Sequence, residues 1–310
     1  MLRSMKFEDI EQVKEIDKLC FKTETKRNSY GIEGYIEASN NASIVYELDN
    51  RVVGYNFIHL WGSFAWFGPF GVHPEYQGNG IGKALINHTI KILKEDYKVS
   101  TIGLNTMPES SYNVGFYMNM GFSPLKLTLS LKKDINSLDF LPTSDNYNVK
   151  ELKLNSENDY LSLENELKSL SCKISKNFDL TSELYLIKNK GFGTVFELKN
   201  NNRTCGIAIC YTKSIRESST KDLQIKLAVI DSSVNYKNAL NSIIDACTNY
   251  AKSISYESIS IDCNTYNTEI CNYLISKHNF KIQRCFVMLL MGKENPFKSK
   301  NALLLTRLAG

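Results

Sequence analysis

One order of strands and helices occurs twice along this chain, and it constrains the fold more than any other feature of the sequence. Apolar residues at alternating or helical spacing predict, in the first half, strands at 1–5, 43–48, 52–60, 63–72, 99–106 and 125–131 and helices at 9–21, 81–95 and 110–120. The second half repeats the pattern with a hairpin at 194–212, strands at 223–231, 258–263 and 282–291 and helices at 236–254 and 269–278. This order predicts an α+β fold, a mixed central β-sheet flanked by helices, in two tandem copies.

The repeat, with a period of about 150 residues, sets the expected domain organisation. We expect a first domain at 1–134, a polar linker at 135–147, a second domain at 148–293 and a C-terminal tail at 294–310. Residues 22–42 are polar and contain glycine, which predicts a loop or a short broken helix. A bulge or break is expected at Gly68–Pro69, because proline removes a donor from the strand ladder.

The composition is that of an ordinary globular protein, with 43% hydrophobic residues, 23% charged residues and a net charge of +4. No apolar run is long enough to span a bilayer, and the N-terminus is charged within its first residues. We therefore expect no membrane anchor or signal peptide and a cytoplasmic location. The short basic patches are typical of solvated surface, so no nucleic-acid partner is expected.

Cysteine and histidine usage argues against a metal site. None of the eight cysteines forms a Cys-x-x-Cys pair, and the four histidines are scattered. Most of the cysteines stand in apolar segments, so we expect buried, reduced thiols and no metal.

A glycine-rich run, VHPEYQGNGIGKAL at 72–85, precedes the predicted helix at 81–95. It is not a Walker A loop, because Gln77 stands where the first glycine is required and Ala84 where the hydroxyl is required. It is not the dinucleotide fingerprint, because the third glycine would fall at Lys83 or at Leu85.

The run does satisfy a third pattern, Gln/Arg-x-x-Gly-x-Gly/Ala, with Gln77, Gly80 and Gly82. In this respect the segment resembles the GCN5-related N-acetyltransferase (GNAT) family, in which this loop binds the pyrophosphate of acetyl-CoA. Glycines allow close approach of the backbone to phosphates, and a helix N-terminus adds partial positive charge. The resemblance implies that acetyl-CoA is a co-substrate, bound by the following residues: Phe70, Val72, Gln77, Gly78, Asn79, Gly80, Ile81, Gly82, Lys83, Asn113 and Tyr117.

A second motif, SSYNVGFYMNMGF at 110–122, supports the resemblance. Tyr117, Gly121 and Phe122 match the family pattern Asn-x-x-Ala-x-x-x-Tyr-x-x-x-Gly-Phe. Ser110 replaces the usual Asn and Asn113 the usual Ala, but serine is a good helix N-cap. Together the two motifs imply the GNAT acyl-CoA N-acyltransferase fold for residues 1–134.

The resemblance implies direct transfer of an acetyl group from acetyl-CoA to a primary amine of a small-molecule or peptide acceptor. Tyr117 is by position the general acid that protonates the leaving thiolate. Many relatives carry a base on the fourth strand, but 63–67 has no titratable residue. His59 is the nearest substitute, and Glu33, Glu37 or a water chain are alternatives. The alternative function is a catalytically idle CoA-binding or regulatory module.

Aromatic residues gather on the strands before the glycine run, at Tyr55, Phe57, Trp61, Phe64, Trp66 and Phe67. Alternate residues of a strand face the core, so one set is expected there and the other to line an acceptor pocket. In the second half the loop that corresponds to the glycine run reads DSSVNYKNAL, with no glycine and with Asp231 at its start. We expect this half to be a degenerate GNAT-like domain that does not bind acetyl-CoA and instead completes the acceptor cleft or forms a homodimer face.

Overall fold

The computed structural model describes residues 1–135, 147–154, 156–217 and 221–308. The first half contains, in chain order, β1 (Leu2–Ser4), α1 (Ile10–Phe21), α2 (Ser29–Ala38), β2 (Ile44–Leu48), β3 (Arg51–Trp61), β4 (Phe64–Val72), α3 (Ile81–Glu95), β5 (Thr101–Thr106), α4 (Ser111–Asn119) and β6 (Ser123–Asp134).

The second half repeats this order element by element, and one further strand follows it. Its elements are β7 (Asn148–Leu152), α5 (Glu157–Ile174), α6 (Thr181–Lys190), β8 (Gly193–Asn200), β9 (Arg203–Tyr211), β10 (Asp222–Asp231), α7 (Tyr236–Ser253), β11 (Ser258–Asn264), α8 (Thr268–His278), β12 (Lys281–Met291) and β13 (Ala302–Leu305). The predicted mixed sheet flanked by helices in two copies is confirmed.

The structure adds elements to those predicted. Residues 29–38 form a regular helix, α2, where the polar sequence indicated a loop or a broken helix. In the second half β7, α5 and α6 precede the predicted hairpin, and β13 lies within the expected tail. Most of the expected linker, 136–146, lies outside the described residues, so the domain boundaries stay a prediction.

All the strands join one sheet, in the order β1-β2-β3-β4-β5-β12-β6-β11-β10-β9-β8-β7, with β13 paired to β10 off this path. The halves exchange their last strands at the centre of this sheet. β12 of the second half pairs antiparallel with β5 of the first, and β6 of the first half pairs antiparallel with β11 of the second. The two exchanged strands also pair with each other. Each half is therefore completed by a strand from the other.

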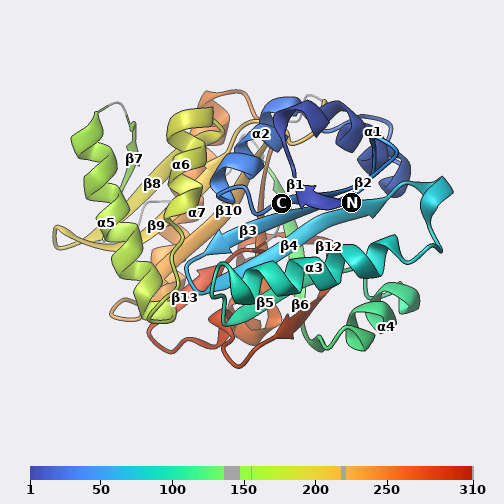
Figure 1. Cartoon of the computed structure of the whole chain (residues 1–310). Helices are drawn as coiled ribbons and strands as arrows, with labels where there is room; N and C mark the ends of the chain where they lie inside the picture. The colour runs from blue at the N-terminus through green and yellow to red at the C-terminus, as the bar shows by residue number, and fades with distance from the viewer. Residues whose placement is uncertain (136–146, 155, 218–220, 309–310) are drawn as a thin grey trace.

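Helices cover both faces of the sheet, as Figure 1 shows with α5 and α6 beside β7 to β10 on the left and α1 and α3 beside β1 to β4 on the right. Buried residues of α1, α2, α5 and α6 belong to one hydrophobic core that runs through both halves. The helices α3 and α4 share a second core with β12, and α3 also packs into a smaller one. The helices α7 and α8 pack into a further core that includes residues of β6. Burial of apolar side chains on both faces stabilises the sheet across the repeat boundary.

Among the described residues no helix combines the length and the apolar character needed to cross a membrane. Nor does this part of the chain gather three His, Cys, Asp or Glu side chains that could hold a metal ion. The cysteines are free, and Cys172 is exposed rather than buried.

Candidate active site

The site begins where β4 and β5 separate. The two strands pair in parallel only from Phe64–Thr101 to Trp66–Gly103. At the last pair the indole of Trp66 lies over Gly103, where an added Cβ would come within 2.3 Å of the ring. Beyond it β4 bulges against β3 and contains Gly68–Pro69, the break that the sequence predicted. The divergence leaves a gap between two strands that would otherwise be joined by hydrogen bonds.

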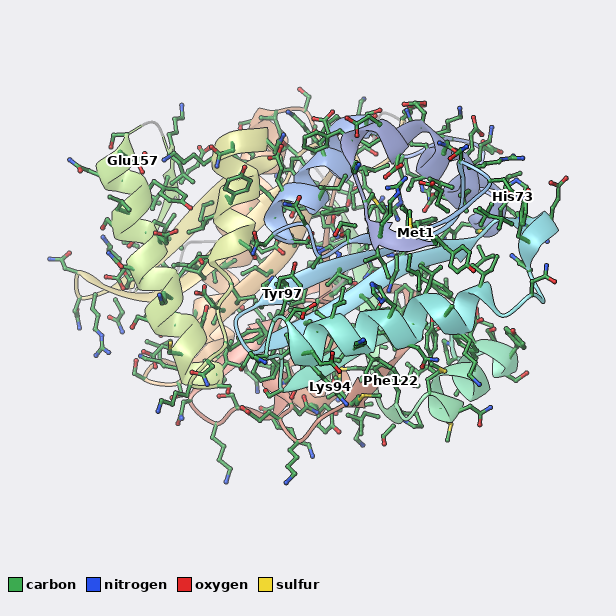
Figure 2. The ribbon with its side chains drawn as sticks, in the orientation of Figure 1. Met1, His73, Lys94, Tyr97, Phe122 and Glu157 are labelled. Carbon is green, nitrogen blue, oxygen red and sulfur yellow. The ribbon has the colours of Figure 1, made fainter. Side chains whose placement is uncertain are left out.

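A cavity of about 1370 Å³ fills this gap and continues toward the second half. From the first half it is lined by the end of β4, the glycine loop, the start of α3, the end of β5 and one side of α4. In Figure 2, His73 marks the end of β4 beside the start of α3, and Lys94 marks the other end of that helix. This volume falls somewhat above the usual range of small-molecule pockets, about 300–1,000 Å³, and suits two substrates.

The glycine loop leads into a helix N-terminus whose first turn has no side-chain cap. Gly78 and Gly80 have φ of +80° and +77°, a conformation that side-chain-bearing residues rarely adopt. Gly80 is the N-cap of α3 and provides no capping side chain, so the first N–H groups of the helix face the cavity without a cap acceptor. Such a terminus binds anions.

The predicted cofactor residues line the cavity with one exception. Phe70, Val72, Gln77, Gly78, Gly80, Ile81, Gly82, Lys83, Asn113 and Tyr117 all line the cavity. The Gln77 amide donates a hydrogen bond to the carbonyl of Val72 at 2.9 Å and thereby holds the loop against the strand end. Asn79 does not line the cavity; its side chain bonds back to the carbonyl of Tyr76 at 3.3 Å.

Tyr117 projects from α4 to the cavity wall. The helix starts at Ser110, whose hydroxyl accepts a hydrogen bond from the Asn113 N–H at 3.3 Å, as the sequence predicted. The Tyr117 ring packs against Phe67 and Phe116, with centroids 6.0 and 5.3 Å away. Burial raises the pKa of its hydroxyl, for which the described residues provide no hydrogen-bond partner. The group is a neutral proton donor on a residue that lines the cavity.

His59 lies outside the cavity lining. Its ring stacks on Trp61 at 5.7 Å, and its Nε2 lies 3.3 Å from the carbonyl of Gly68. Burial lowers the pKa of His59 to about 3. This environment supports the bulge of β4 and gives the ring no direct access to an acceptor, so its role as a base stays an untested prediction.

The other candidate bases and the aromatic cluster also lie away from the cavity. Glu37 binds Lys190 at 2.8 Å and accepts a hydrogen bond from Tyr185 at 2.9 Å, and so joins α2 to α6. Glu33 lies 3.7 Å from the same lysine. Of the aromatic residues predicted to divide between core and pocket, all are buried in the core and only Phe67 lines the cavity.

The second half contributes a wall of the same cavity. Tyr211, residues 213–216, Arg284, Phe286 and Arg307 line it. Segment 213–217 is fastened over the cavity, because Asn28 donates hydrogen bonds to the carbonyls of Ser214 and Arg216 at 2.7 and 2.6 Å. The sequence did not predict that these residues line the cavity, because they belong to no recognisable motif and their position depends on the strand exchange.

In the second half the positions that correspond to the cofactor site are filled by the protein itself. The side chain of Asn235 caps α7 and accepts hydrogen bonds from the N–H groups of Lys237 and Asn238, both at 3.1 Å. Asp231, at the end of β10, forms an ion pair with Lys173.

β10 bulges against β9 between Ile225 and Leu227, as β4 bulges against β3. After this bulge, residues Ala228 to Asp231 of β10 pair with β13. Where β4 leaves an open gap, β10 therefore has a strand of the protein beside it. At the position that corresponds to the glycine loop, the described residues of the second half therefore provide a capped helix terminus at α7 and a paired strand edge at β10.

Comparison with known proteins agrees with this geometry. Residues 10–122 match the model of the acetyltransferase (GNAT) family. The search of curated proteins finds none that matches. Among solved structures, the chain is similar to an acetyltransferase described as putative from Pyrococcus horikoshii, with 17% identity, 97% of this chain and 92% of that chain covered and a TM-score of 0.69.

Two further structures have the same fold over nearly their whole length. A GCN5-related N-acetyltransferase from Sphaerobacter thermophilus has 9% identity and a TM-score of 0.65, with 96% of this chain and 98% of that chain covered. A tandem GNAT protein from the clavulanic acid biosynthesis pathway has 12% identity and a TM-score of 0.62, with 95% and 99% covered. Residues 10–122 therefore form a domain of the acetyltransferase (GNAT) family, and the whole chain has the tandem GNAT fold, with a glycine loop in the first half and a degenerate counterpart in the second.

Proposed function

We propose that the protein transfers an acetyl group from acetyl-CoA to a primary amine of a small-molecule or peptide acceptor. The observation that carries the proposal is the convergence of three features on one cavity. These are the uncapped N-terminus of α3, the gap between β4 and β5, and the unpaired hydroxyl of Tyr117. The first suits a pyrophosphate, the second an extended pantetheine arm, and the third a leaving thiolate.

The chemistry follows from this arrangement. The acceptor amine attacks the thioester carbonyl as the free base, so a proton leaves the amine before or during attack. Collapse of the tetrahedral intermediate breaks the carbon–sulfur bond, and the Tyr117 hydroxyl protonates the departing sulfur to give the thiol of CoA. The tyrosinate then regains its proton, directly or through water, from the nitrogen that has been acetylated. A hydroxyl buried among aromatic rings remains protonated near neutral pH, because its pKa is raised. The acceptor enters from the side of the cavity that the second half lines.

The test is release of free thiol from acetyl-CoA across a panel of primary amines, with the wild type, Tyr117→Phe and Tyr97→Phe. Tyr97 is the matched control because its hydroxyl bonds to the carbonyl of Asn40, away from the cavity. We expect amine-dependent thiol release that falls strongly in Tyr117→Phe and not in Tyr97→Phe. Binding of acetyl-CoA without turnover on any amine would instead support an idle CoA-binding module.

A further inference from the structure

The end of the cavity that the second half lines is richer in basic than in acidic side chains among the described residues. Some of these charges are paired, since Lys221 binds Glu257 at 2.7 Å and Lys132 lies 3.8 Å from Asp222. The acidic side chains of the lining are Asp134, Asp222 and Glu257, and the lining also contains arginines, including Arg27 and Arg307.

Arg307 lies next to the gap between β4 and β5. Its carbonyl accepts a hydrogen bond from the side chain of Asn105, a cavity residue of β5, at 2.7 Å. Its guanidinium lies over the ring of Phe286, 4.8 Å from the centroid. Asp262 is 4.0 Å from its Nε, too far for a hydrogen bond, and the Nε is buried without a hydrogen-bond partner. The charge of Arg307 is therefore only weakly compensated.

Arg27 is a second incompletely paired guanidinium on the wall, and its side chain is only 8% exposed. Its Nε donates to Asp17 at 2.8 Å. The same carboxylate accepts a hydrogen bond from Tyr55 and pairs with Arg216 at 2.9 Å, so its charge is shared. The Arg27 Nη1 is buried with no hydrogen-bond partner. Buried donors of this kind are rare in folded proteins and indicate a missing acceptor.

Resting on the proposed function, we propose that the acceptor is a primary amine that also carries a carboxylate, and that Arg307 and Arg27 bind this carboxylate. The sheet register sets the scale of such a molecule. Val287 pairs with Thr106 at the end of β5, and Phe286, under the Arg307 guanidinium, precedes it. One strand residue spans about 3.3 Å, so the Arg307 guanidinium stands close to the end of β5, which borders the strand gap, and we infer an acceptor of amino-acid size.

A carboxylate fits this wall better than a phosphate does. The guanidinium fork matches the planar carboxylate through two parallel hydrogen bonds. Asp17 and Asp262 stand behind the two arginines, and the remaining positive charge suits one negative charge rather than two. Positive charge near the acceptor also lowers the pKa of its ammonium group and so favours the free amine. This effect assists attack on the thioester, because β4 has no titratable residue at 63–67 to act as a base.

The experiment compares α-amino acids with their carboxamides in the thiol-release assay. Loss of the carboxylate charge lowers the pKa of the neighbouring amine, so without charge recognition the amides would react at least as well. We expect kcat/KM to be at least tenfold higher for the acids than for the amides. In Arg307→Gln this preference should fall about tenfold, while the KM for acetyl-CoA is unchanged. Arg51→Gln, an exposed residue at the start of β3, is the control.

A binding measurement separates failure of this inference from failure of the proposed function. The deamino carboxylic acids corresponding to the same amino acids, which cannot be acetylated, should raise the melting temperature more than their amides do, and Arg307→Gln should remove the difference. Arg307→Lys keeps the positive charge but lacks the planar guanidinium that donates two parallel hydrogen bonds. It should leave a difference in melting temperature between that of the wild type and that of Arg307→Gln. Turnover with equal preference for acids and amides would overturn the inference alone.

Absence of turnover on both series and on every other amine of the panel would overturn the proposed function, and the melting shifts would then decide the carboxylate site by themselves. Shifts that are equal for acids and amides would reject the site, as would acid-specific shifts that persist in Arg307→Gln.

Discussion

The side chain of Asn105 donates a hydrogen bond to the main-chain carbonyl of Arg307, at 2.7 Å and across 202 residues of sequence. One partner lies on β5, where the strand gap of the first half opens, and the other follows β13 of the second half. The glycine loop is a local feature of the first half, whereas the opposite wall of the cavity is built from segments distant in sequence. A single cavity is thus lined by both copies of the repeat.

Gly82→Val should abolish the rise in melting temperature that acetyl-CoA produces. Gly82 lies in the first turn of α3 without a positive φ, and an added Cβ would stand 3.3 Å from the ring of Phe70. The backbone therefore tolerates the substitution better than it would at Gly80, while the branched side chain covers the N–H groups that face the cavity. Thermal unfolding with and without acetyl-CoA measures the effect. Gly115→Ala, at a helix position with free space, is the control, and a full shift in Gly82→Val would contradict this placement of the pyrophosphate.

Tyr117→Phe should lower kcat by about 10²–10⁴-fold, the usual contribution of a positioned general acid. Burial holds the pKa of this hydroxyl above its usual value near 10. The proton therefore remains on the oxygen as the pH rises, and kcat of the wild type should show no alkaline loss between pH 8 and pH 10. The pH profile of kcat measures this, and a fall centred below pH 10 that disappears in Tyr117→Phe would show that the hydroxyl is not buried as described.

The first-half site was largely predictable from sequence, because its geometry is local. Glycines at fixed spacing before a helix specify the loop, and Tyr117 follows from its distance to Gly121 and Phe122. The composite wall was not predictable, because strand alternation indicates that 125–131 and 282–291 are strands but not which strands they pair with. Helices α5 and α6 were not predicted because polar residues interrupt their hydrophobic faces. Their helical structure is stabilised by tertiary packing, which buries Leu167 and Leu184.

His59→Gln should make the protein less sensitive to acid. The pKa of His59 is lowered from 6.5 to about 3 by burial, so the unfolded chain binds a proton below pH 6.5 that the folded protein does not. Stability is therefore complete above pH 6.5 and is lost as the pH falls toward 3. Between pH 7.5 and pH 5 this group should account for a loss of about 2 kcal/mol in the free energy of unfolding.

Urea unfolding of His59→Gln at the two pH values measures this difference. The glutamine amide can still donate to the carbonyl of Gly68, so folding should be retained. Most of the acetyltransferase activity should also persist if the ring is structural, and a specific loss of activity with unchanged stability would restore His59 as the base.

A fragment of residues 1–135 should not fold to a stable monomer. Without the second half, β5 loses its neighbour β12, and β6 loses both β11 and β12. The exposed edges include Leu129 and Leu131, which are buried in the whole chain, and unpaired apolar edges promote aggregation. Co-expression with residues 147–310 should restore a soluble, acetyl-CoA-binding complex, because both exchanged strands then find their partners. Size-exclusion chromatography and circular dichroism distinguish the two states. A monomeric 1–135 fragment with cooperative unfolding and an acetyl-CoA melting shift would show that the strand exchange is dispensable for the first domain.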